Sequence, residues 1–573
     1  MTSDSDAMPE STSPAQGDLR EGAVGAVAAG ASITARIAAD VLRDGGNAAD
    51  AAVAGALASW ISEAIFTNAG SGALILVREP KGPVRALDAF ATMPGLQPPP
   101  GDQPLDFRLK QLRYGETDLE FRIGRGSVAV PGFPAGLATL HRRYGSRPLP
   151  ELVAPAVRLA REGVVWSERH RELAGVLSPI MTDTPENAAL VGLDHADGRP
   201  SPPRLTTMPE LGDMIEQLGK HGLDSFYQGP IADAIVADQA AHGGLVTHRD
   251  LSAYRVLETS TLRLRLAGWD LWLPGTPSLG GTMVAAMLAL WATLAQREPP
   301  PTPGTTATDA ALAHRWAVVI DAVNANRAAI ESAATDGAAL TQIIRPLVPL
   351  VSQAMHTLAP PNSGEDPRLP GGTTHLSIVD DAGMAVSMSS SAGESAGYLV
   401  PGLGTMLNNM LGEGDLHHGG FHRAPPGTRL PTMMAPMLLT QGNPRHPRSI
   451  LAMGSGGSMR IRTALSQVSW WVTSEGADLA EAIERPRRHF EELKLHLEAA
   501  RDDRGELAAA ERLRAWGYDV VCWPERSGFF GGVHAARIDR TRGHGRPSGH
   551  GDSRRDGDAA LVGAANDTGV EQR

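Results

Sequence analysis

The sequence predicts an α/β fold in which helices cover a core of strands. Its 573 residues are 42% hydrophobic and 20% charged, the composition of a soluble globular protein. The first part of the chain is rich in alanine-containing segments of helical type. From Thr373 onward, short runs that alternate between apolar and polar residues predict strands. Helices that flank strands from both halves favour a layered domain assembled from the whole chain.

Composition and charge exclude several classes of protein. The net charge of −12 argues against a nucleic-acid binder, and the only cysteine, Cys522, allows no intrachain disulfide. The longest apolar runs, Ala51–Ser62 and Gly281–Ala295, are shorter than the roughly 20 residues of a membrane span and predict buried helices. Residues 1–21 are polar and acidic, which predicts a disordered arm rather than a secretory signal. We therefore expect a cytoplasmic protein with no nucleic-acid or membrane partner.

Turn residues and periodicity place the elements of the first part of the chain. Gly45 and Gly46 end one helix, and Asn47 caps the next. The pattern then predicts two short strands, at Ala73–Val77 and Val84–Leu87, and a loop at Pro98–Pro104. A long, mostly helical stretch follows at Gly132–Met355, with one pair of strands inside it at Leu262–Pro274.

A predicted hairpin opens the second part of the chain. Thr373–Asp380 and Met384–Ser389 alternate, and the turn Asp381-Ala382-Gly383 joins them. The tail from Asp539 is polar and rich in Gly and Arg, which predicts partial disorder. Between hairpin and tail we expect further strands near Met406, Met434–Leu439, Ile450–Met453, Asp519 and Gly531–Ile538, and one helix at Met459–Ser474.

The sequence Gly371-Gly372-Thr373-Thr374 at the head of this hairpin has two interpretations. Spacing alone favours a strand with a flexible entry. Alternatively, the chain is cut between Gly372 and Thr373, and the polar segment Asn362–Gly372 is suited to exposure before such a cut. A new N-terminal threonine would carry its own base, an α-amine with an ordinary pKa of about 7.7–8. The two glycines would tolerate strain and leave the carbonyl open to the threonine hydroxyl.

A second glycine-rich stretch is a candidate oxyanion hole. Met453–Arg460 (MGSGGSMR) lies between a predicted strand and a predicted helix, where backbone N–H groups favour negative charge. An ordinary turn is the alternative. The stretch lacks the Lys-Ser/Thr pair of a phosphate-binding P-loop and is not a G-x-S-x-G elbow. His417, His418 and His422 lie in a glycine-rich loop that does not favour a metal site. We expect no metal and no cofactor.

Several other motifs follow one another along most of the chain. They are GGNAADAAVA (Gly45–Ala54), VAVPGFPAGLATLHRRYG (Val128–Gly145), Phe226–Tyr254, PSLGGT (Pro277–Thr282), TTHLSIVDDAG (Thr373–Gly383), MLNNM (Met406–Met410) and SRRDGDA (Ser553–Ala559). In type and order they resemble the γ-glutamyltransferase (gamma-glutamyltranspeptidase) family of N-terminal-nucleophile hydrolases. The resemblance implies an αββα four-layer sandwich. It also implies autocleavage into a large subunit, residues 22–372, and a small catalytic subunit, residues 373–573, which stay interwoven.

The same resemblance implies roles for individual residues. Thr373 would be the nucleophile, Ser391 would support its amine, and backbone N–H groups of Gly457 and Ser458 would form the oxyanion hole. The family's substrate clamp falls on Phe90, Gly393, Met410, Glu413, Thr432 and Met433. Four of these replace an Arg, an Asn, a Gln and a Ser, and each lost charge-assisted bond would cost about 1.5–3 kcal/mol. Arg423, Arg429 or the nearby histidines are candidates for a new clamp.

These departures predict a changed substrate. We expect an autoprocessed threonine hydrolase or acyltransferase that acts on a small carboxylated, partly apolar metabolite. The chain resembles divergent family members of actinomycete antibiotic pathways that build alkylproline units, which implies hydrolysis of a C–C bond beside a carbonyl. Amide hydrolysis and acyl transfer stay open. One alternative is a genuine γ-glutamyl enzyme that uses glutathione-like amides, and another is an unprocessed, non-catalytic binding protein.

Overall fold

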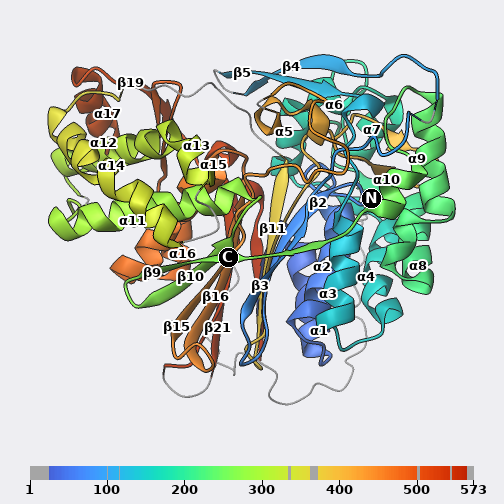
Figure 1. Cartoon of the computed structure of the whole chain (residues 1–573), viewed down its shortest axis with the longest axis horizontal. Helices are drawn as coiled ribbons and strands as arrows, with labels where there is room; N and C mark the ends of the chain where they lie inside the picture. Colours follow the sequence, from blue (N-terminus) through green and yellow to red (C-terminus); the bar gives the residue numbers. More distant parts are fainter. Residues whose placement is uncertain are drawn as a thin grey trace, which may run out of the picture.

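Two sheets stacked face to face form the centre of the molecule (Figure 1). The computed structural model describes residues 25–563 except 100, 115–116, 303, 333–336, 362–371, 418, 500–503 and 542–544. The predicted N-terminal arm and the segment before Gly372 lie outside the described residues. So do the last residues of the tail.

The first sheet is antiparallel and carries the predicted hairpin at its centre. Its order is β22-β1-β11-β12-β2-β3-β8. The strands are β22 (Asp558–Val562), β1 (Gly25–Ala29), β11 (Thr373–Asp380), β12 (Ala385–Ser391), β2 (Gly72–Arg78), β3 (Val84–Ala89) and β8 (Leu257–Thr259). Every residue of β11 and β12 is buried, because the sheet is covered on both faces.

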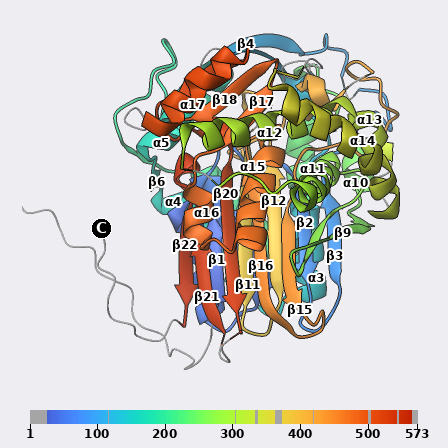
Figure 2. The same cartoon turned by 90° about the vertical axis from the view of Figure 1, so that its left-hand side faces the viewer.

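The second sheet has the order β21-β20-β16-β15-β10-β9 and is also antiparallel (Figure 2). Its strands are β21 (Arg546–His550), β20 (Gly532–Asp539), β16 (Pro447–Gly456), β15 (Met437–Gly442), β10 (Trp269–Pro274) and β9 (Thr261–Leu266). Leu76 and Val379 of the first sheet pack against Leu438, Ile450 and Ile538 of the second. This apolar layer holds the two sheets together.

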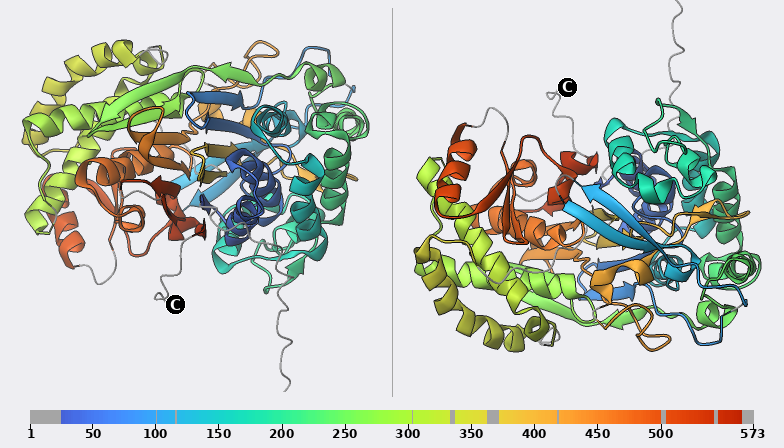
Figure 3. Two further views of the ribbon diagram at one scale, coloured as in Figure 1. Left: turned by 90° about the horizontal axis from the view of Figure 1, so that it is seen from below. Right: turned by 90° about the horizontal axis from the view of Figure 1, so that it is seen from above.

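Helices cover the outer face of each sheet, so the four layers are α, β, β and α (Figure 3). On the first sheet lie α1 (Ser32–Arg43) and α2 (Ala48–Ser62), with α3 (Phe133–Tyr144), α4 (Leu149–Glu162) and α8 (Pro209–His221) packed around them. On the second lie α11 (Leu279–Arg297), α12 (Thr306–Ala325), α14 (Gly337–Thr357) and α15 (Arg460–Trp470). The predicted αββα sandwich is confirmed.

The first predicted helix cap is present in detail. Asn47 accepts hydrogen bonds from the N–H groups of Ala49 and Asp50, and Asp50 bonds back to the N–H of Asn47. All residues of α2 are buried between the first sheet and α4, which explains why the helix is apolar on every side. Among the described helices, α11 alone has the length and apolarity of a membrane span, and most of it is buried in the second helix layer.

Smaller elements surround this framework. The remaining helices are α5 (Glu168–Val176), α6 (Ser178–Met181), α7 (Pro185–Leu190), α9 (Pro230–Ala241), α10 (His248–Ala253), α13 (Arg327–Ser332), α16 (Leu479–Glu484) and α17 (Arg504–Ala515). The remaining strands are β4 (Arg108–Tyr114), β5 (Thr117–Ile123), β6 (Val164–Val165), β7 (Leu205–Thr206), β13 (Leu399–Val400), β14 (Thr405–Met406), β17 (Arg488–Glu491), β18 (Lys494–Glu498) and β19 (Asp519–Trp523).

The structure departs from the sequence prediction at both ends of the described chain. No strand was predicted at β1, yet Gly25–Ala29 pairs with β11 on one side and β22 on the other. The tail after Asp539 is more structured than expected, because β21 and β22 add one strand to each sheet. Tertiary pairing therefore overrides local composition in these segments.

Candidate active site

The predicted cleavage point lies at the end of a central hairpin of the first sheet. Thr373 is the first residue of β11, and its partner across the strands is Ser391, the last residue of β12. Both side chains are buried. The turn at the other end of the hairpin fixes this register, so the two hydroxyl-bearing residues face each other.

The carbonyl predicted to be attacked accepts a hydrogen bond from a side chain. Ser391 Oγ donates to the oxygen of Gly372 at 2.6 Å and accepts from the N–H of Gly393 at 3.0 Å. A side chain at Gly372 would collide with the backbone oxygen of Gly393, so the close approach requires glycine. A donor on this oxygen draws electron density from the carbonyl carbon, which favours attack by a nearby nucleophile.

A buried acid and a buried arginine hold the backbone on either side of the junction. The N–H of Gly372 donates to the carboxylate of Glu394, and Arg555 Nη1 donates to the oxygen of Thr373 at 3.3 Å. Burial raises the pKa of Glu394 to about 8, although the charge of Arg555 acts in the opposite direction. Neither Glu394 nor Arg555 was predicted as a site residue from the sequence.

A second buried acid lies behind the nucleophile strand. Glu63, the residue that ends α2, accepts a hydrogen bond from Thr34 at 2.9 Å and another from Thr374. Burial raises the pKa of Glu63 to about 7, and the two hydroxyl groups lower it only in part. Successive side chains of a strand point to opposite faces, so Glu63 lies on the face away from the Thr373 side chain.

The predicted oxyanion loop packs directly against the nucleophile. It joins the end of β16 at Gly456 to the start of α15, and a side chain at Gly456 would collide with the oxygen of Thr373. Gly457 and Ser458 have φ values of +118° and +51°. The loop therefore turns through the left-handed region next to Thr373. That the N–H groups of Gly457 and Ser458 donate to the oxyanion stays a prediction.

A small cavity gathers most of the predicted site residues. It measures about 30 Å³, close to the share of liquid volume of one water molecule. Gly393 lies against its wall, because a side chain there would collide with the carboxylate of Glu413. Of the predicted residues, only Gly372, Gly393 and Gly457 do not line it. The lining residues are Phe90, Thr373, Ser391, Met410, Glu413, Leu416, Thr432, Met433, Met434, Ser458 and Ile461.

Apolar side chains form the far wall of this cavity. Phe90, Met410 and Leu416 belong to one buried cluster, and Met433 packs with Leu279 and Met459 in another. Phe90 is fixed by its backbone, whose N–H donates to Asp88 at 2.8 Å. The positions at which the resemblance calls for Arg, Gln and Ser are therefore part of the hydrophobic core.

None of the described candidates for a replacement clamp reaches this cavity. Arg429 is engaged by Asp88 at 3.4 Å, by the hydroxyl of Tyr254 at 2.6 Å and by the oxygen of Arg255 at 2.6 Å. Arg423 is exposed, and the others bond to backbone: His417 to Met410 at 2.9 Å and His422 to Gly126 at 2.8 Å. His418 lies outside the described residues.

Metal-ligating side chains do not cluster in the described part of the chain. No group of three or more His, Cys, Asp or Glu residues there is arranged to hold a metal ion. The groups near the junction that can act in nucleophilic attack, proton transfer or charge stabilisation include the hydroxyl of Thr373, the two buried acids Glu63 and Glu394, and Arg555.

Comparisons with known proteins agree with this fold. Residues 34–562 match the sequence model of the gamma-glutamyltranspeptidase family. The acylase ACY 1 proenzyme of Pseudomonas sp. strain V22 is 28% identical over 521 residues, which cover 88% of this chain and 89% of that protein. The glutathione hydrolase proenzyme of Pseudomonas aeruginosa is 27% identical over 544 residues, or 90% and 91% of the two chains.

Among solved structures, the cephalosporin acylase from Bacillus halodurans has the same fold. Its TM-score is 0.73 at 22% sequence identity, with 96% of this chain and 98% of that chain covered. The motifs, the four-layer sandwich and the matched family model lead to one assignment. This chain belongs to the gamma-glutamyltranspeptidase family and is a hydrolase or acylase of the N-terminal-nucleophile type.

Proposed function

We propose that the chain cuts itself between Gly372 and Thr373 and that Thr373 then hydrolyses an amide or C–C bond of a small carboxylated, partly apolar metabolite. The single observation that carries this substrate class is the apolar wall of the cavity beside Thr373. Phe90, Met410 and Met433 form it where a γ-glutamyl enzyme of the resembled type needs polar groups.

Self-cleavage uses the groups around the junction. The hydroxyl of Thr373 loses its proton as its oxygen bonds to the carbonyl carbon of Gly372. Ser391 stabilises the oxyanion that forms, through the bond it already makes to that oxygen. The C–N bond then breaks as the nitrogen of Thr373 takes up a proton, which leaves an ester. Water hydrolyses the ester, so that Gly372 ends in a carboxylate and Thr373 regains its hydroxyl and gains a free amine.

Turnover repeats the same attack on a foreign carbonyl. The free amine of Thr373 accepts the hydroxyl proton as the oxygen attacks, and the leaving group receives that proton. The loop at Gly457 and Ser458 supplies backbone N–H groups for the oxyanion. The packing of this loop against Thr373 supports the assignment. Water then releases the acyl group, and another nucleophile in its place would give acyl transfer.

A γ-glutamyl head group fits the apolar wall poorly. It carries an α-carboxylate and an α-ammonium, and an unpaired buried charge is strongly unfavourable. Among the described lining residues, Glu413 is the one acid and none is basic. An acyl group that places an apolar body on this wall and keeps its carboxylate outside the cavity avoids this penalty. The second candidate function, glutathione-type hydrolysis, rests on the family assignment and on the names of several relatives.

We place the reaction in the biosynthesis of an antibiotic or another secondary metabolite, as a tailoring step in the cytoplasm. The support for this role is the resemblance of the motifs to divergent family members of such pathways. The apolar wall of the cavity beside Thr373 also supports it, because this wall favours a substrate less polar than glutamate.

Two measurements test the proposal. A denaturing gel should show bands of roughly 39 and 21 kDa, from the 60.3 kDa chain divided in proportion to residue number. Edman sequencing of the smaller band should begin Thr-Thr-His-Leu-Ser. Thr373→Ala should give one uncut, inactive chain, whereas Thr374→Ser, which keeps a hydroxyl for Glu63, should be cut. An uncut wild-type chain would favour the binding-protein alternative.

Substrate class is tested by kinetics on the processed protein. γ-Glutamyl p-nitroanilide is compared with a panel of ring-containing carboxylated amides and ketones. We expect turnover of at least one panel member and poor turnover of the anilide. A kcat/KM for the anilide on the order of 10⁴ M⁻¹s⁻¹ or more, an ordinary enzyme efficiency, would show a genuine γ-glutamyl enzyme.

A further inference from the structure

We propose that the chain has a second small-molecule site, for an alkyl or aryl carboxylate, on the helix side of the nucleophile strand. A cavity of about 530 Å³ lies there, which we call the rear cavity. It is formed by the segments 30–36, 62–66, 163–173 and 555–556 together with Leu205. Its volume falls in the range of ordinary ligand sites, roughly 300–1,000 Å³. The cavity beside Thr373 is far smaller.

The rear cavity is separate from the cavity beside Thr373 but lies close to the nucleophile strand. Glu63 lines it and accepts a hydrogen bond from Thr374, whose side chain points away from the face that Thr373 uses. Arg555 also lines it and donates to the oxygen of Thr373 at 3.3 Å. The two cavities share no lining residue. A ligand here would therefore bind without occupying the acyl site.

A buried histidine with an unpaired ring nitrogen lines this cavity. His170 is 6% exposed, and its Nε2 has no hydrogen-bond partner among the described residues. Trp166 stacks on the ring at 3.9 Å between centroids and 7° between planes, which fixes its orientation. Burial lowers the pKa of His170 to about 3, so the ring is neutral and offers one donor and one acceptor. Leaving such an atom unpaired is unfavourable, so a ligand group that displaces its surroundings and bonds to it would be favoured.

Two guanidinium groups line the cavity, beside two acids. Arg36 is exposed and lines the cavity, and it makes no hydrogen bond or ion pair with any described residue. Arg555 is the second; it donates to the backbone oxygens of Thr373 and Gly528, and its charge also acts on Glu394. The acids on the lining are engaged, Glu63 by two threonines and Asp556 by Ser167. A carboxylate is the ligand group that a guanidinium binds best.

The mouth of the cavity is apolar. Val165 and Leu205 are cross-strand partners on the two-stranded ribbon β6–β7, and they are 59% and 60% exposed. Both line the rear cavity, together with the partly buried Ile33. Two large apolar side chains at the rim give the cavity an apolar entrance, against which the apolar body of a ligand would pack. The cavity thus matches a ligand with an acidic end and a hydrocarbon body.

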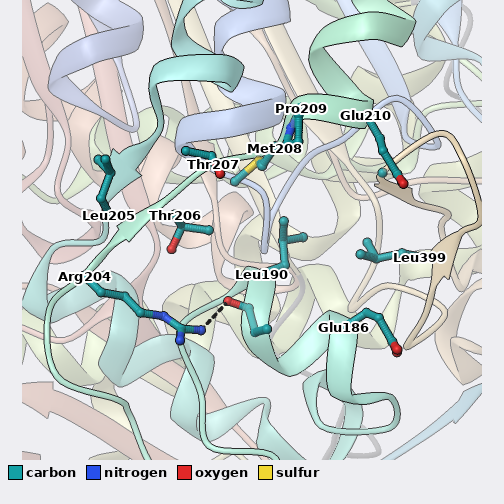
Figure 4. Close-up of a pocket in the computed structure, with 12 residues that line it drawn as sticks. Glu186, Leu190, Arg204, Leu205, Thr206, Thr207, Met208, Pro209, Glu210 and Leu399 are labelled. Atoms are coloured by element: carbon teal, nitrogen blue, oxygen red, sulfur yellow. Dashed lines mark hydrogen bonds between the residues drawn. The ribbon is translucent and has the colours of Figure 1, made fainter.

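A neighbouring surface pocket offers a matched control. It measures about 400 Å³ and is lined by Arg204, Thr206 and the acids Glu186 and Glu210 (Figure 4). Leu205 lies at its edge, away from the two acids. Arg204 lines this pocket but not the rear cavity, and it donates to the oxygen of Ala189 at 3.0 Å. Removing its charge therefore tests a nearby arginine with no role in the proposed site.

The test is isothermal titration of the processed protein with phenylacetate and with decanoate. We expect saturable binding of at least one probe. Arg36→Gln and His170→Phe should each weaken it at least about tenfold, whereas Arg204→Gln should leave it unchanged. Arg36 is exposed, so its variant should fold even if His170→Phe does not. Met433→Trp, which fills the cavity beside Thr373, should also leave probe binding unchanged.

Three results would overturn the proposal. They are the absence of saturable binding by both probes, an equal loss in Arg36→Gln and Arg204→Gln, and a loss of binding in Met433→Trp. Binding is measured without turnover, so the outcome does not depend on which substrate Thr373 uses.

Discussion

Ser391 makes a contact whose effect on self-cleavage can be measured directly. Its hydroxyl bonds to the oxygen of Gly372 at 2.6 Å, so it stabilises charge there during attack. Loss of one oxyanion donor typically slows a reaction by about 10²–10³-fold. We therefore expect Ser391→Ala to slow self-cleavage by that order, measured as the fraction of uncut chain over time after synthesis. Ser391→Thr keeps the hydroxyl and should cut at close to the parent rate. An alanine variant that cuts normally would remove Ser391 from the mechanism.

Glu394 links the stability of the uncut chain to pH. Burial raises its pKa from 4.5 to about 8 in the folded state, which therefore holds the proton more tightly than the unfolded state. Stability from this proton is fully present below about pH 4.5 and is lost as the pH rises through about 8.

Glu394→Gln removes this titration and keeps an acceptor for the N–H of Gly372. In a Thr373→Ala background, we expect the Tm of this variant to exceed that of its parent by a margin that grows between pH 5 and pH 9. The difference in unfolding free energy should reach on the order of 1–4 kcal/mol. Glu525→Gln, at an exposed position, is the control and should follow the parent at every pH. A margin that does not change with pH would mean that Glu394 titrates normally.

At the scale of single residues, site residues that belong to a sequence motif could be predicted, and residues that reach the site only through folding could not. Phe90, Met410 and Met433 could be found because each replaces a polar residue of a recognisable motif. Glu63 and Glu394 belong to no such pattern. Glu394 reaches Gly372 once the β11–β12 hairpin pairs, and Glu63 reaches Thr374 only after that hairpin packs against the end of α2. Arg555 lies in a recognised motif, but its contact with Thr373 spans 182 positions and has no local signal.

The loop between β16 and α15 makes a prediction at the scale of elements. A Cβ at Gly457 would lie 2.7 Å from the Cα of Gly531, and the φ of +118° is strained for any other residue. Gly457→Ala should move the N–H groups of the loop and slow both self-cleavage and turnover, by about 10²-fold if one donor is lost.

Gly476 is the matched control for this variant. Its φ is +70°, and a Cβ there would meet nothing within 4 Å. Gly476→Ala should therefore lower stability by about 1–2 kcal/mol through backbone strain alone and leave both rates unchanged. If Gly457→Ala also leaves both rates unchanged while Tm falls, the oxyanion hole lies elsewhere.

Elements with a clear period could be predicted from the sequence, and those set by pairing could not. β11 was predicted at Thr373–Asp380, its observed bounds, because apolar and polar residues alternate and a tight turn follows. β1 (GAVAA) has an alanine-rich composition that resembles the helices beside it, and it is a strand because β11 and β22 enclose it. The hairpin β4–β5 was missed: β4 (RLKQLRY) is rich in charged residues and does not alternate, although β5 ends in the short alternating run LEFRI.

At the scale of the whole molecule, the predicted cut would divide the strands of each of the two central sheets between the large and the small subunit. The large subunit would supply β1, β2, β3 and β8 to the first sheet and β9 and β10 to the second. The small subunit would supply β11, β12 and β22, and β15, β16, β20 and β21. β1 would lie between two strands of the other subunit. The two pieces would therefore share one hydrophobic core and one set of backbone hydrogen bonds.

We accordingly expect the cut subunits to remain together until the protein unfolds. Size-exclusion chromatography of the processed protein should give one peak that contains both bands. Its elution volume should match that of uncut Thr373→Ala. In urea, separation of the subunits should coincide with loss of the far-UV circular dichroism signal. Two peaks in native buffer would show that the cut falls elsewhere or that the subunits are not interwoven.

The position of β22 sets a time at which the first sheet can close. β1 is the first of the described strands to leave the ribosome and β22 is the last, although they are direct neighbours. At roughly 5–20 residues per second, the ribosome needs about half a minute to two minutes to make the intervening chain. Arg555, which holds the carbonyl of Thr373, also comes from this late segment. The cutting site therefore cannot assemble until nearly the whole chain has been translated and has left the ribosome.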